Sequence, residues 1–274
     1  MRRNYTEYQK QVRALAHQAL TAAGAPGLPP GQGPALNRLA CVVAVHYSWD
    51  CLRRLRRAQQ EGRRILVHSA LVPETCSNEL LELAQAVAPV VYSADHVLIE
   101  AEFATEGSDQ RGSCNFVVGF PVTQRIECLR PPMLVLDGVG SGQNIGQILR
   151  TAYHLGVNSV VASRAAWNNL GGRASRVSMG WLYFMDFHLA DPLTDALQAL
   201  RAQGIKIYAA ENQFSLPVAP HHGVDARAPG GCTRFASNWA LVVGHEGEGV
   251  SKEAVALSDE RICVPQQRGE SLNV

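Results

Sequence analysis

The chain has 274 residues, enough for one large domain or two ordinary ones, and its hydrophobic content of 46% is well above that of disordered chains. The formal net charge is only +1 at pH 7, so overall charge argues neither for nor against a nucleic-acid partner. Positive charge rests on 22 arginines and 3 lysines, a bias that suits phosphate recognition but that a GC-rich genome also produces.

The seven cysteines include no C-x-x-C pair, and their number is odd. We therefore expect neither a disulfide framework nor a zinc site, and a reducing cytosol is the simplest location. The N-terminal stretch MRRNYTEYQK lacks the apolar region of a secretory signal. No apolar run approaches the roughly 18 residues of a membrane span, so we expect a cytoplasmic protein without a membrane partner.

The first half of the chain alternates helical and extended segments. A helix is predicted over 5–23, ended by Gly24, and the Pro/Gly-rich stretch 25–34 is predicted to be a loop or linker. The apolar segment 39–48 is either a strand or a buried turn of helix. Helical spacing and β-branched runs then predict helices at 49–64, 77–88 and 95–104 and strands at 65–72, 89–94 and 115–122. We expect an extension at 1–38, a small α/β domain at 39–122 and a linker at 123–132.

The second half, residues 133–274, repeats this alternation. Strands are predicted at 133–139, 157–163, 205–211, 239–244 and 261–265, and helices beginning near Asn144 and covering 192–204. Strands that alternate with helices at this spacing predict a mostly parallel sheet with flanking helices. The fold class expected for both halves is therefore α/β.

The loop that follows the strand at 133–139 is a candidate ligand-binding loop. It reads Asp137-Gly-Val-Gly-Ser-Gly and leads into the helix that carries Asn144 and Arg150. Ligands of parallel α/β sheets bind at the carboxyl ends of strands, and helix N-termini favour anions. The loop has neither the lysine of a Walker A motif nor the G-x-G-x-x-G spacing of a dinucleotide site. The alternative is an ordinary turn followed by a solvated arginine.

A second glycine-bearing loop follows the strand at 239–244. Its sequence Gly244-His-Glu-Gly-Glu-Gly249 places three glycines within six residues, which allows backbone to approach a ligand closely. The next strand ends at Val264-Pro265 and enters another polar loop. Two such loops at neighbouring strand ends suit a ligand held mainly by main-chain groups, although two ordinary turns give the same pattern.

Three segments resemble, in order and spacing, the three motifs of the SpoU/TrmH family of SPOUT-class RNA methyltransferases. They are NIGQILRTAYHLGV, VVGHEGEGVS and VPQQRGESLNV. The resemblance covers residues 133–274 and implies S-adenosyl-L-methionine as cofactor, a trefoil-knot methyltransferase domain and a homodimer. Less specifically, the first half resembles the substrate-binding domain of this family, which is similar to a small ribosomal RNA-binding protein.

The resemblance assigns roles to individual residues. Asn144 and Arg150 match the first motif, Glu246 the second, and Ser271 and Asn273 the third. Family positions whose backbone holds the cofactor correspond to Gly244, Val264 and Leu272. His245 and residues 266–268 occupy variable positions. In the family the third motif continues into a helix that completes the knot, so the ending SLNV is expected to be a truncated motif.

The implied reaction methylates a ribose 2′-hydroxyl, and Arg150 is the family's proposed activator of that group. Because arginine stays protonated in proteins, we expect Arg150 to hold an RNA phosphate and to stabilise the developing alkoxide. The other four motif side chains would orient the loops and the ribose. No metal is required, and His221 and His222 are expected to be a loop pair rather than ligands.

Local positive charge for RNA binding is concentrated in residues 53–64, which hold six arginines. The proposed phosphate contacts are Arg53, Arg54, Arg56 and Arg57, whereas the alternative is a solvated helix face. Arg125 and Arg130 are weaker candidates.

Three functions remain open at this point. The first is a dimeric enzyme that methylates a ribose 2′-hydroxyl of tRNA or rRNA. The second is a non-catalytic RNA-binding protein that retains the SPOUT fold. The third is a nucleotide-binding α/β enzyme of another kind, for which binding of ATP or NAD in place of S-adenosyl-L-methionine would be evidence.

Overall fold

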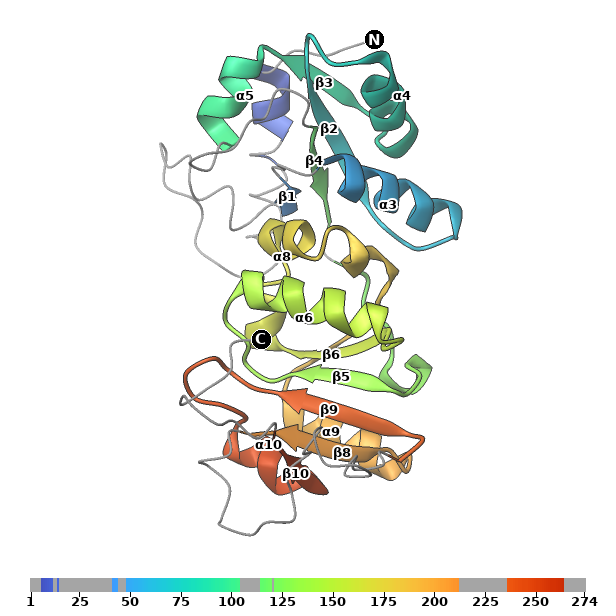
Figure 1. Ribbon diagram of the computed structural model, residues 1–274, viewed down its shortest axis with the longest axis vertical. Helices are drawn as coiled ribbons and strands as arrows, with labels where there is room; N and C mark the ends of the chain where they lie inside the picture. The colour runs from blue at the N-terminus through green and yellow to red at the C-terminus, as the bar shows by residue number, and fades with distance from the viewer. Residues whose placement is uncertain are drawn as a thin grey trace, which may run out of the picture. The chain divides into compact units, whose positions relative to one another are not determined.

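The computed structural model describes residues 6–11, 14, 41–43, 48–103, 114–119, 121–211 and 236–263. Two compact units make up the chain (Figure 1). The N-terminal unit comprises Met1–Pro121 and Leu170–Phe184, and the C-terminal unit comprises Val122–Asn169 and Met185–Val274. Residues 170–184 therefore cluster with the N-terminal unit, although they lie within the second half of the sequence.

The N-terminal unit contains a four-stranded sheet in the order β1-β4-β2-β3, in which only β2 and β3 pair in parallel. Its strands are β1 (Cys41–Val43), β2 (Val67–Pro73), β3 (Val91–Ala94) and β4 (Asn115–Val118). Its helices are α3 (Ser48–Gln60), α4 (Asn78–Val87), α5 (His96–Phe103), α8 (Gly172–Val177) and the 3-10 turn η3 (Trp181–Phe184). Each of the elements predicted between 49 and 122 is confirmed, and the ambiguous segment 39–48 contributes a strand.

Helices α3 and α4 follow from the spacing of their apolar residues. Along α3, Cys51, Leu52, Leu55 and Ala58 are fully buried, and the arginines occupy the remaining faces. Helix α4 begins after Ser77, whose side chain accepts a hydrogen bond from the Leu80 backbone N–H, as the sequence predicts for an N-cap.

The described part of the predicted first helix, residues 6–11, is helical. Its Tyr8 is 1% exposed, and the ring makes an edge contact with Tyr92 at 5.4 Å between centroids. Tyr8 belongs to a core cluster with Leu71 and Val117 on neighbouring strands. The helix is thus packed on the sheet of its own unit. The loop predicted at 25–34 lies outside the described residues.

The C-terminal unit is built on a six-stranded sheet in the order β10-β8-β9-β5-β6-β7, and every pairing is parallel. Its strands are β5 (Met133–Leu136), β6 (Ser159–Ser163), β7 (Asp186–Ala190), β8 (Lys206–Ala210), β9 (Trp239–Val243) and β10 (Glu260–Ile262). Its helices are α6 (Gly142–His154), α7 (Arg164–Trp167), α9 (Leu193–Ala202) and α10 (Lys252–Leu257), with the 3-10 turn η2 (Ile126–Cys128). The predicted parallel sheet with flanking helices is confirmed.

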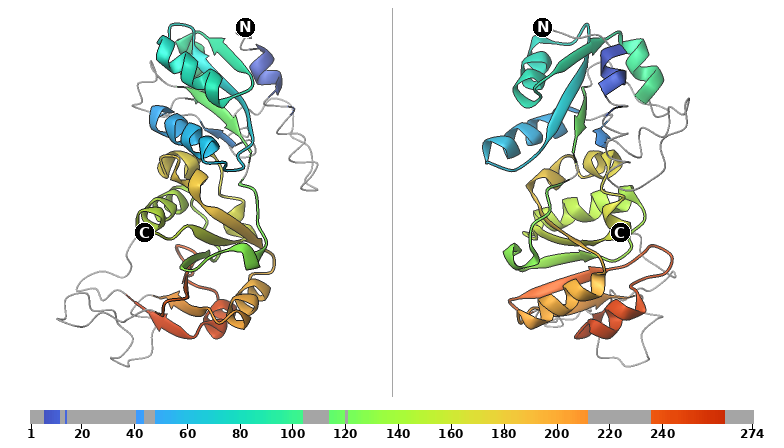
Figure 2. Two further views of the ribbon diagram at one scale, coloured as in Figure 1. Left: turned by 90° about the vertical axis from the view of Figure 1, so that its right-hand side faces the viewer. Right: turned by 180° about the vertical axis from the view of Figure 1, so that it is seen from behind.

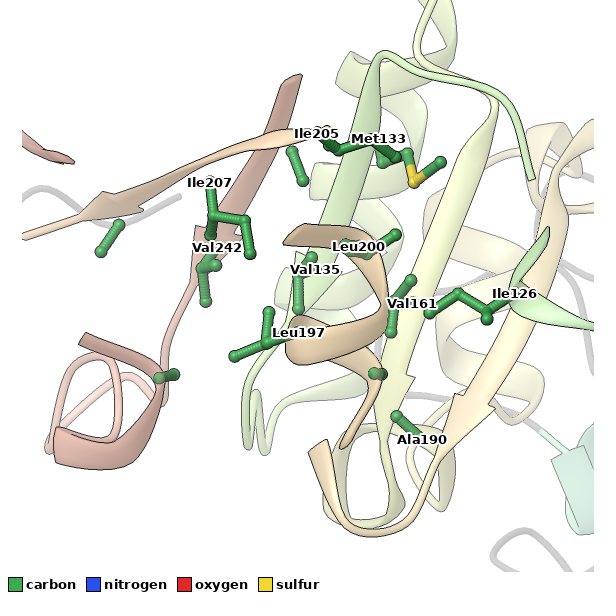
Figure 3. Packing of buried hydrophobic residues seen from close by; sticks show 14 of the residues in the cluster. Ile126, Met133, Val135, Val161, Ala190, Leu197, Leu200, Ile205, Ile207 and Val242 are labelled. Carbon is green, nitrogen blue, oxygen red and sulfur yellow. The ribbon is translucent and has the colours of Figure 1, made fainter. Parts of the chain in front are cut away.

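The core of this unit lies between the sheet and α9 (Figure 3). Val135, Val161 and Val242 come from β5, β6 and β9, and Leu197 and Leu200 of α9 pack against them. Burying each such side chain stabilises the fold by roughly 1.5–3 kcal/mol. Helix α6 covers the opposite face of the sheet (Figure 2).

The residues predicted as a linker, 123–132, are packed against the C-terminal unit. Ile126 is buried in its core. The Gln124 backbone N–H donates to the Phe187 carbonyl at 2.7 Å, and the Gln124 side chain donates to Asp186 at 2.7 Å. Strand β7 is thereby flanked by this segment.

Within the described part of the chain, every helix is too short or too polar to cross a bilayer.

The strand order brings two chain segments together that are far apart in the sequence. Strand β9 pairs with β5, with Val243 opposite Leu136, and the Asp137 backbone N–H donates to the Val243 carbonyl at 2.8 Å. Strands β6 and β7 extend the sheet on one side of β5, whereas β9, β8 and β10 extend it on the other side. The order of the strands therefore reverses between β5 and β9. Ligands of open parallel sheets bind at such a reversal, beyond the carboxyl ends of the strands.

Candidate active site

The loop after β5 leads directly into a capped helix. Ser141 is the N-cap of α6, and its side chain accepts a hydrogen bond from the Asn144 backbone N–H at 3.3 Å. The helix begins at Gly142, two residues before the predicted start. Asn144 is only 9% exposed, so this polar side chain needs a partner within the protein.

That partner is Glu246, which follows β9. Its carboxylate accepts hydrogen bonds from the backbone N–H groups of Gly140 at 3.0 Å and Ser141 at 2.9 Å. It also accepts one from the Asn144 side-chain amide at 2.8 Å. The carboxylate therefore ties the loop after β9 to the N-terminus of α6, where a negative charge is favoured by the free N–H groups.

Partial burial alone would raise the pKa of Glu246. The hydrogen bonds from the backbones of Gly140, Glu246 itself and Ser141, and from the Asn144 side chain, outweigh burial and lower this pKa below its ordinary value. Glu246 is consequently ionised at neutral pH, with both carboxylate oxygens occupied by donors. Its chemistry is that of a fixed anion that organises two loops, since it has little tendency to accept a proton.

The loop after β9 is closed on itself. Backbone hydrogen bonds of 2.9 Å join His245 and Gly249 in both directions. At Gly244, an added Cβ would lie 2.1 Å from the Gly249 carbonyl carbon, so only glycine fits. The loop ends at Ser251, whose backbone N–H donates to the Asp137 carboxylate at 2.7 Å. Both ends of the loop are thus fixed to the β5 side of the site.

His245 covers the neighbouring loop. Its Nδ1 accepts a hydrogen bond from the Gly247 backbone N–H at 3.1 Å. A Cβ added to Gly140 would lie 3.4 Å from His245 Nε2 and 3.5 Å from the Glu246 carboxylate, so both side chains lie over Gly140. The two glycine-bearing loops therefore form one connected surface.

Arg150 lies on the same helix as Asn144 but points elsewhere. At about 100° per residue, the two side chains leave α6 roughly 120° apart. Arg150 is exposed. Within the ranges that the structure describes, no hydrogen bond or ion pair involves its guanidinium, whereas its backbone carbonyl contacts His154 Nδ1 at 2.7 Å. The guanidinium is available to a ligand from outside.

The structure thus brings Asn144, Gly244 and Glu246 together and leaves Arg150 on the same helix. Four predicted site residues lie outside the described residues, namely Val264, Ser271, Leu272 and Asn273. The pair His221 and His222 also lies outside them. Among the residues that are described, no three His, Cys, Asp or Glu side chains are grouped as metal ligands would be.

The four arginines proposed to contact phosphates all have partners within the N-terminal unit. Arg53 pairs with Glu79 at 3.3 Å and lies over the Trp49 ring. Arg56 donates to the Ala86 carbonyl at 2.8 Å, and Arg57 pairs with Glu61 at 2.8 Å. The ion pairs of Arg53 and Arg57 are exposed and exchangeable, because surface ion pairs contribute little, and the Arg56 hydrogen bond is exposed as well.

Arg54 is held more firmly than its neighbours on α3. It donates to the Met179 carbonyl at 2.6 Å, and its guanidinium lies 4.5 Å from the centroid of the Trp181 ring. Of the two weaker candidates, Arg125 pairs with Glu127 at 3.2 Å. The Arg130 guanidinium has no hydrogen-bond or ion-pair partner in the described ranges, and its backbone N–H donates to Ser159 at 3.0 Å.

Sequence reasoning did not identify Asp137, Gly140, Ser141 or Ser251 as residues that organise the site. A signal existed for the serines, since Ser141 and Ser251 each precede a helix at the N-cap position. For Asp137 and Gly140 the contacts are to residues more than a hundred positions away. No local pattern indicates such pairs.

Comparison with known proteins identifies relatives of the C-terminal unit. The model of the SpoU rRNA Methylase family matches residues 131–274. An uncharacterized tRNA/rRNA methyltransferase of Mycobacterium bovis is 34% identical over 142 residues, which is 51% of this chain and 46% of that protein. The 23S rRNA (guanosine-2′-O-)-methyltransferase RlmB of Bordetella pertussis is 29% identical over 143 residues, 52% of this chain and 54% of that protein. The chain spans about half the length of these curated relatives.

Solved structures share the fold along nearly the whole chain. The SpoU methyltransferase AviRb of Streptomyces viridochromogenes, in complex with AdoMet, matches with a TM-score of 0.66 at 20% identity, covering 96% of this chain and 90% of that one. An rRNA methyltransferase of Sinorhizobium meliloti matches with a TM-score of 0.69 at 16% identity, covering 100% of this chain and 92% of that one. At these identities the likeness concerns the fold.

Proposed function

The chain belongs to the SpoU rRNA Methylase family, and we propose that it transfers a methyl group from S-adenosyl-L-methionine to a ribose 2′-hydroxyl of tRNA or rRNA. The observation that carries this proposal is the contact of Glu246 with Asn144 and with the N-terminus of α6. It assembles two of the three motif segments at the point where the strand order reverses. RlmB, a relative of this chain, is named for a ribose 2′-O-methylation.

The geometry of the site fits the proposed cofactor. Gly244 has no side chain, and its backbone lies beside that of Gly249 and Val250, so the edge of the site is formed by main-chain groups. Main-chain donors and acceptors suit an adenosine group, which offers ring nitrogens and hydroxyls. Gly244, together with Val264 and Leu272, would hold the cofactor. When bound, it supplies an electrophilic methyl group on a positively charged sulfur.

The side chains of the site have distinct proposed roles. Arg150 would bind an RNA phosphate and stabilise negative charge as the ribose oxygen loses its proton to solvent. Asn144 and Glu246 hold the two loops in place, so that the ribose oxygen is aligned with the methyl group. Ser271 and Asn273 would orient the ribose. Their roles rest on the resemblance of the third motif.

The N-terminal unit is the proposed RNA-binding part. Residues 39–122 would form this domain, joined through 123–132 to a methyltransferase domain at 133–274, and the clustering supports adding 170–184 to the first. Arg53, Arg56 and Arg57 would contact phosphates by exchanging their surface partners. Arg54 would instead hold α3 to the segment around Met179.

Three further properties are proposed from the family resemblance. They are a homodimer formed by the methyltransferase domain, a trefoil knot in that domain, and a cytoplasmic location. Light scattering on the purified chain tests the dimer, since a monomeric mass over the whole concentration range would contradict it.

Methyl transfer itself is the direct test of the function. The chain is incubated with radiolabelled S-adenosyl-L-methionine and either tRNA or rRNA from a strain that lacks the gene. Nuclease digestion and mass spectrometry then identify the product. A 2′-O-methylated nucleoside supports the proposal, whereas a base-methylated product contradicts it. RNA binding without any methyl transfer would favour the non-catalytic alternative.

A further inference from the structure

Helix α8 brings two arginines into the N-terminal unit. The segment 170–184 packs on α3, where the Cys51 thiol lies 3.9 Å from the Ser175 carbonyl. A Cβ added to Gly180 would lie 3.2 Å from the Cys51 backbone and 3.3 Å from Arg54. The contact between α3 and this segment is therefore tight. Arg176 follows Ser175 directly, at this contact.

Arg176 differs from the arginines of α3. Its side chain is half-buried, yet in the described ranges of the chain its guanidinium has neither an ion pair nor a hydrogen bond. Arg54, at the same contact, is satisfied by the Met179 carbonyl and the Trp181 ring. The guanidinium nitrogens of Arg176 remain accessible to solvent, so this permanently charged group can bind an acceptor from outside.

The charges around Arg176 are mostly positive. Burial, and next the positive charge of Arg173, lower the pKa of Arg176, while Cys51 acts in the opposite direction. Burial raises the pKa of Cys51 to about 12. The charges of Arg54 and Arg176 lower this pKa, and the charge of Asp50 raises it. Arg173, three residues before Arg176 on α8, adds a second positive charge one helical turn away.

We propose that Arg176, with Arg173 beside it, is a phosphate-binding site for RNA on the N-terminal unit. A phosphate group offers the planar guanidinium of Arg176 two acceptor oxygens at once, and its charge would compensate that of Arg176. Helix α8 packs against α3, which lies in the segment 48–64. This segment holds six arginines and two acidic residues, although the net charge of the whole chain is only +1. Such a local concentration of positive charge favours RNA, with its many phosphates, over a ligand with a single phosphate. This site rests on the proposed function, which makes RNA the substrate.

Fluorescence anisotropy with a short labelled RNA stem-loop tests the site. Arg176→Gln should weaken binding about ten-fold at low salt, as expected for the loss of one charge-assisted contact. The slope of log K against log salt should become shallower by about 0.7 to 0.9, the value for one lost phosphate contact. Arg176→Lys should be intermediate, because it keeps the charge but not the fork. Arg201→Gln, an exposed arginine of α9 in the other unit, is the matched control and should bind like the wild type.

Two further measurements separate this site from the cofactor site and from folding. S-adenosyl-L-methionine titrated into Arg176→Gln should bind as it does to the wild type, so that the RNA site can fail while the methyltransferase proposal stands. Thermal unfolding establishes that each variant is folded. If Arg176→Gln does not fold, the RNA affinity and the salt slope of Arg176→Lys and Arg173→Gln test the site instead.

Several results would overturn the proposal. The first is that Arg176→Gln binds RNA with the same affinity and the same salt slope as the wild type. The second is a wild-type chain that binds no RNA, which would also remove RNA as the substrate. Inorganic phosphate that stabilises the wild type but does not compete with RNA would indicate a site for a free anion instead.

Discussion

The side-chain amide of Asn144 donates a 2.8 Å hydrogen bond to the carboxylate of Glu246, across 102 positions of the sequence. The same carboxylate accepts two backbone N–H groups from the loop before α6. One side chain therefore determines how the loops after β5 and β9 are placed relative to each other. The proposed cofactor site depends on that placement.

Removing this carboxylate should damage both stability and cofactor binding. Glu246→Ala removes the acceptor of two exposed N–H groups and of the Asn144 amide, and the loss at the largely buried Asn144 should cost about 1–3 kcal/mol in the free energy of unfolding. Urea unfolding measures this cost, and titration of S-adenosyl-L-methionine should show lost affinity. Glu248→Ala, two residues further along the same exposed loop, is the control. Equal effects of the two substitutions would contradict the organising role of Glu246.

The ionisation of Glu246 predicts a pH dependence. Against the effect of partial burial, its hydrogen bonds hold the pKa of the folded chain below the ordinary value of 4.5. The folded state thus binds this proton less readily than the unfolded state, so the stabilisation is fully present above pH 4.5 and is lost as pH falls through the lowered pKa. Thermal melts of Glu246→Gln should lack this component of acid destabilisation. Identical losses in the variant and the wild type would refute it.

The backbone approach at Gly244 predicts a large difference between two glycines of one loop. Gly244→Ala places a methyl group 2.1 Å from backbone atoms of Gly249, so the loop must shift and affinity for S-adenosyl-L-methionine should be lost. Gly247→Ala meets only the His245 ring at 3.8 Å and should bind nearly as the wild type does. Calorimetric titration of both variants checks this. Normal binding by Gly244→Ala would mean that this loop does not form the cofactor site.

Removing the Asp137 carboxylate should lower the free energy of unfolding more than removing an ion-paired aspartate on the surface. It is 9% exposed and accepts a hydrogen bond from the Ser251 backbone N–H, so Asp137→Ala should cost about 1–3 kcal/mol. Asp191→Ala removes an exposed pair with Arg164 and should cost about 1 kcal/mol or less. The two values are compared by urea unfolding. A larger loss of unfolding free energy for Asp191→Ala than for Asp137→Ala would contradict the stabilising role of Asp137.

Arg150 should affect methyl transfer without affecting the fold. Its guanidinium is exposed and, in the described residues, without a partner, so Arg150→Ala should leave the melting temperature and the affinity for S-adenosyl-L-methionine unchanged. The rate of methyl transfer should fall by about 10²-fold or more, the size found when one group that stabilises developing charge is removed. Arg150→Lys should recover part of the rate. Full activity of Arg150→Ala would exclude Arg150 from the reaction.

Much of the fold follows from local sequence patterns. Strand β5 is an uninterrupted apolar run, and α4 and α6 have serine caps followed by helical spacing. Strand β7 was missed because its alternation of polar and apolar residues extends only over Asp186–Leu189, at the edge of the sheet. Helix α10 was missed because six residues are too few to show a helical period.

Other features depend on contacts that no local pattern specifies. The motif residues Asn144 and Glu246 could be named from the sequence, but the pairing of β9 with β5 that joins them could not be derived from it. The sequence predicts Arg54 as a phosphate contact, but it gives no sign of the hydrogen bond to the Met179 carbonyl 125 positions away. The clustering of 170–184 with the N-terminal unit is likewise a consequence of long-range packing.

Calorimetric titration of S-adenosyl-L-methionine into the 274-residue chain, with ATP and NAD as comparison ligands, tests the central claim most directly. We predict binding of S-adenosyl-L-methionine alone, and loss of that binding in Gly244→Ala but not in Gly247→Ala. Preferential binding of ATP or NAD, or no binding of S-adenosyl-L-methionine by the folded wild type, would contradict the assignment of the cofactor.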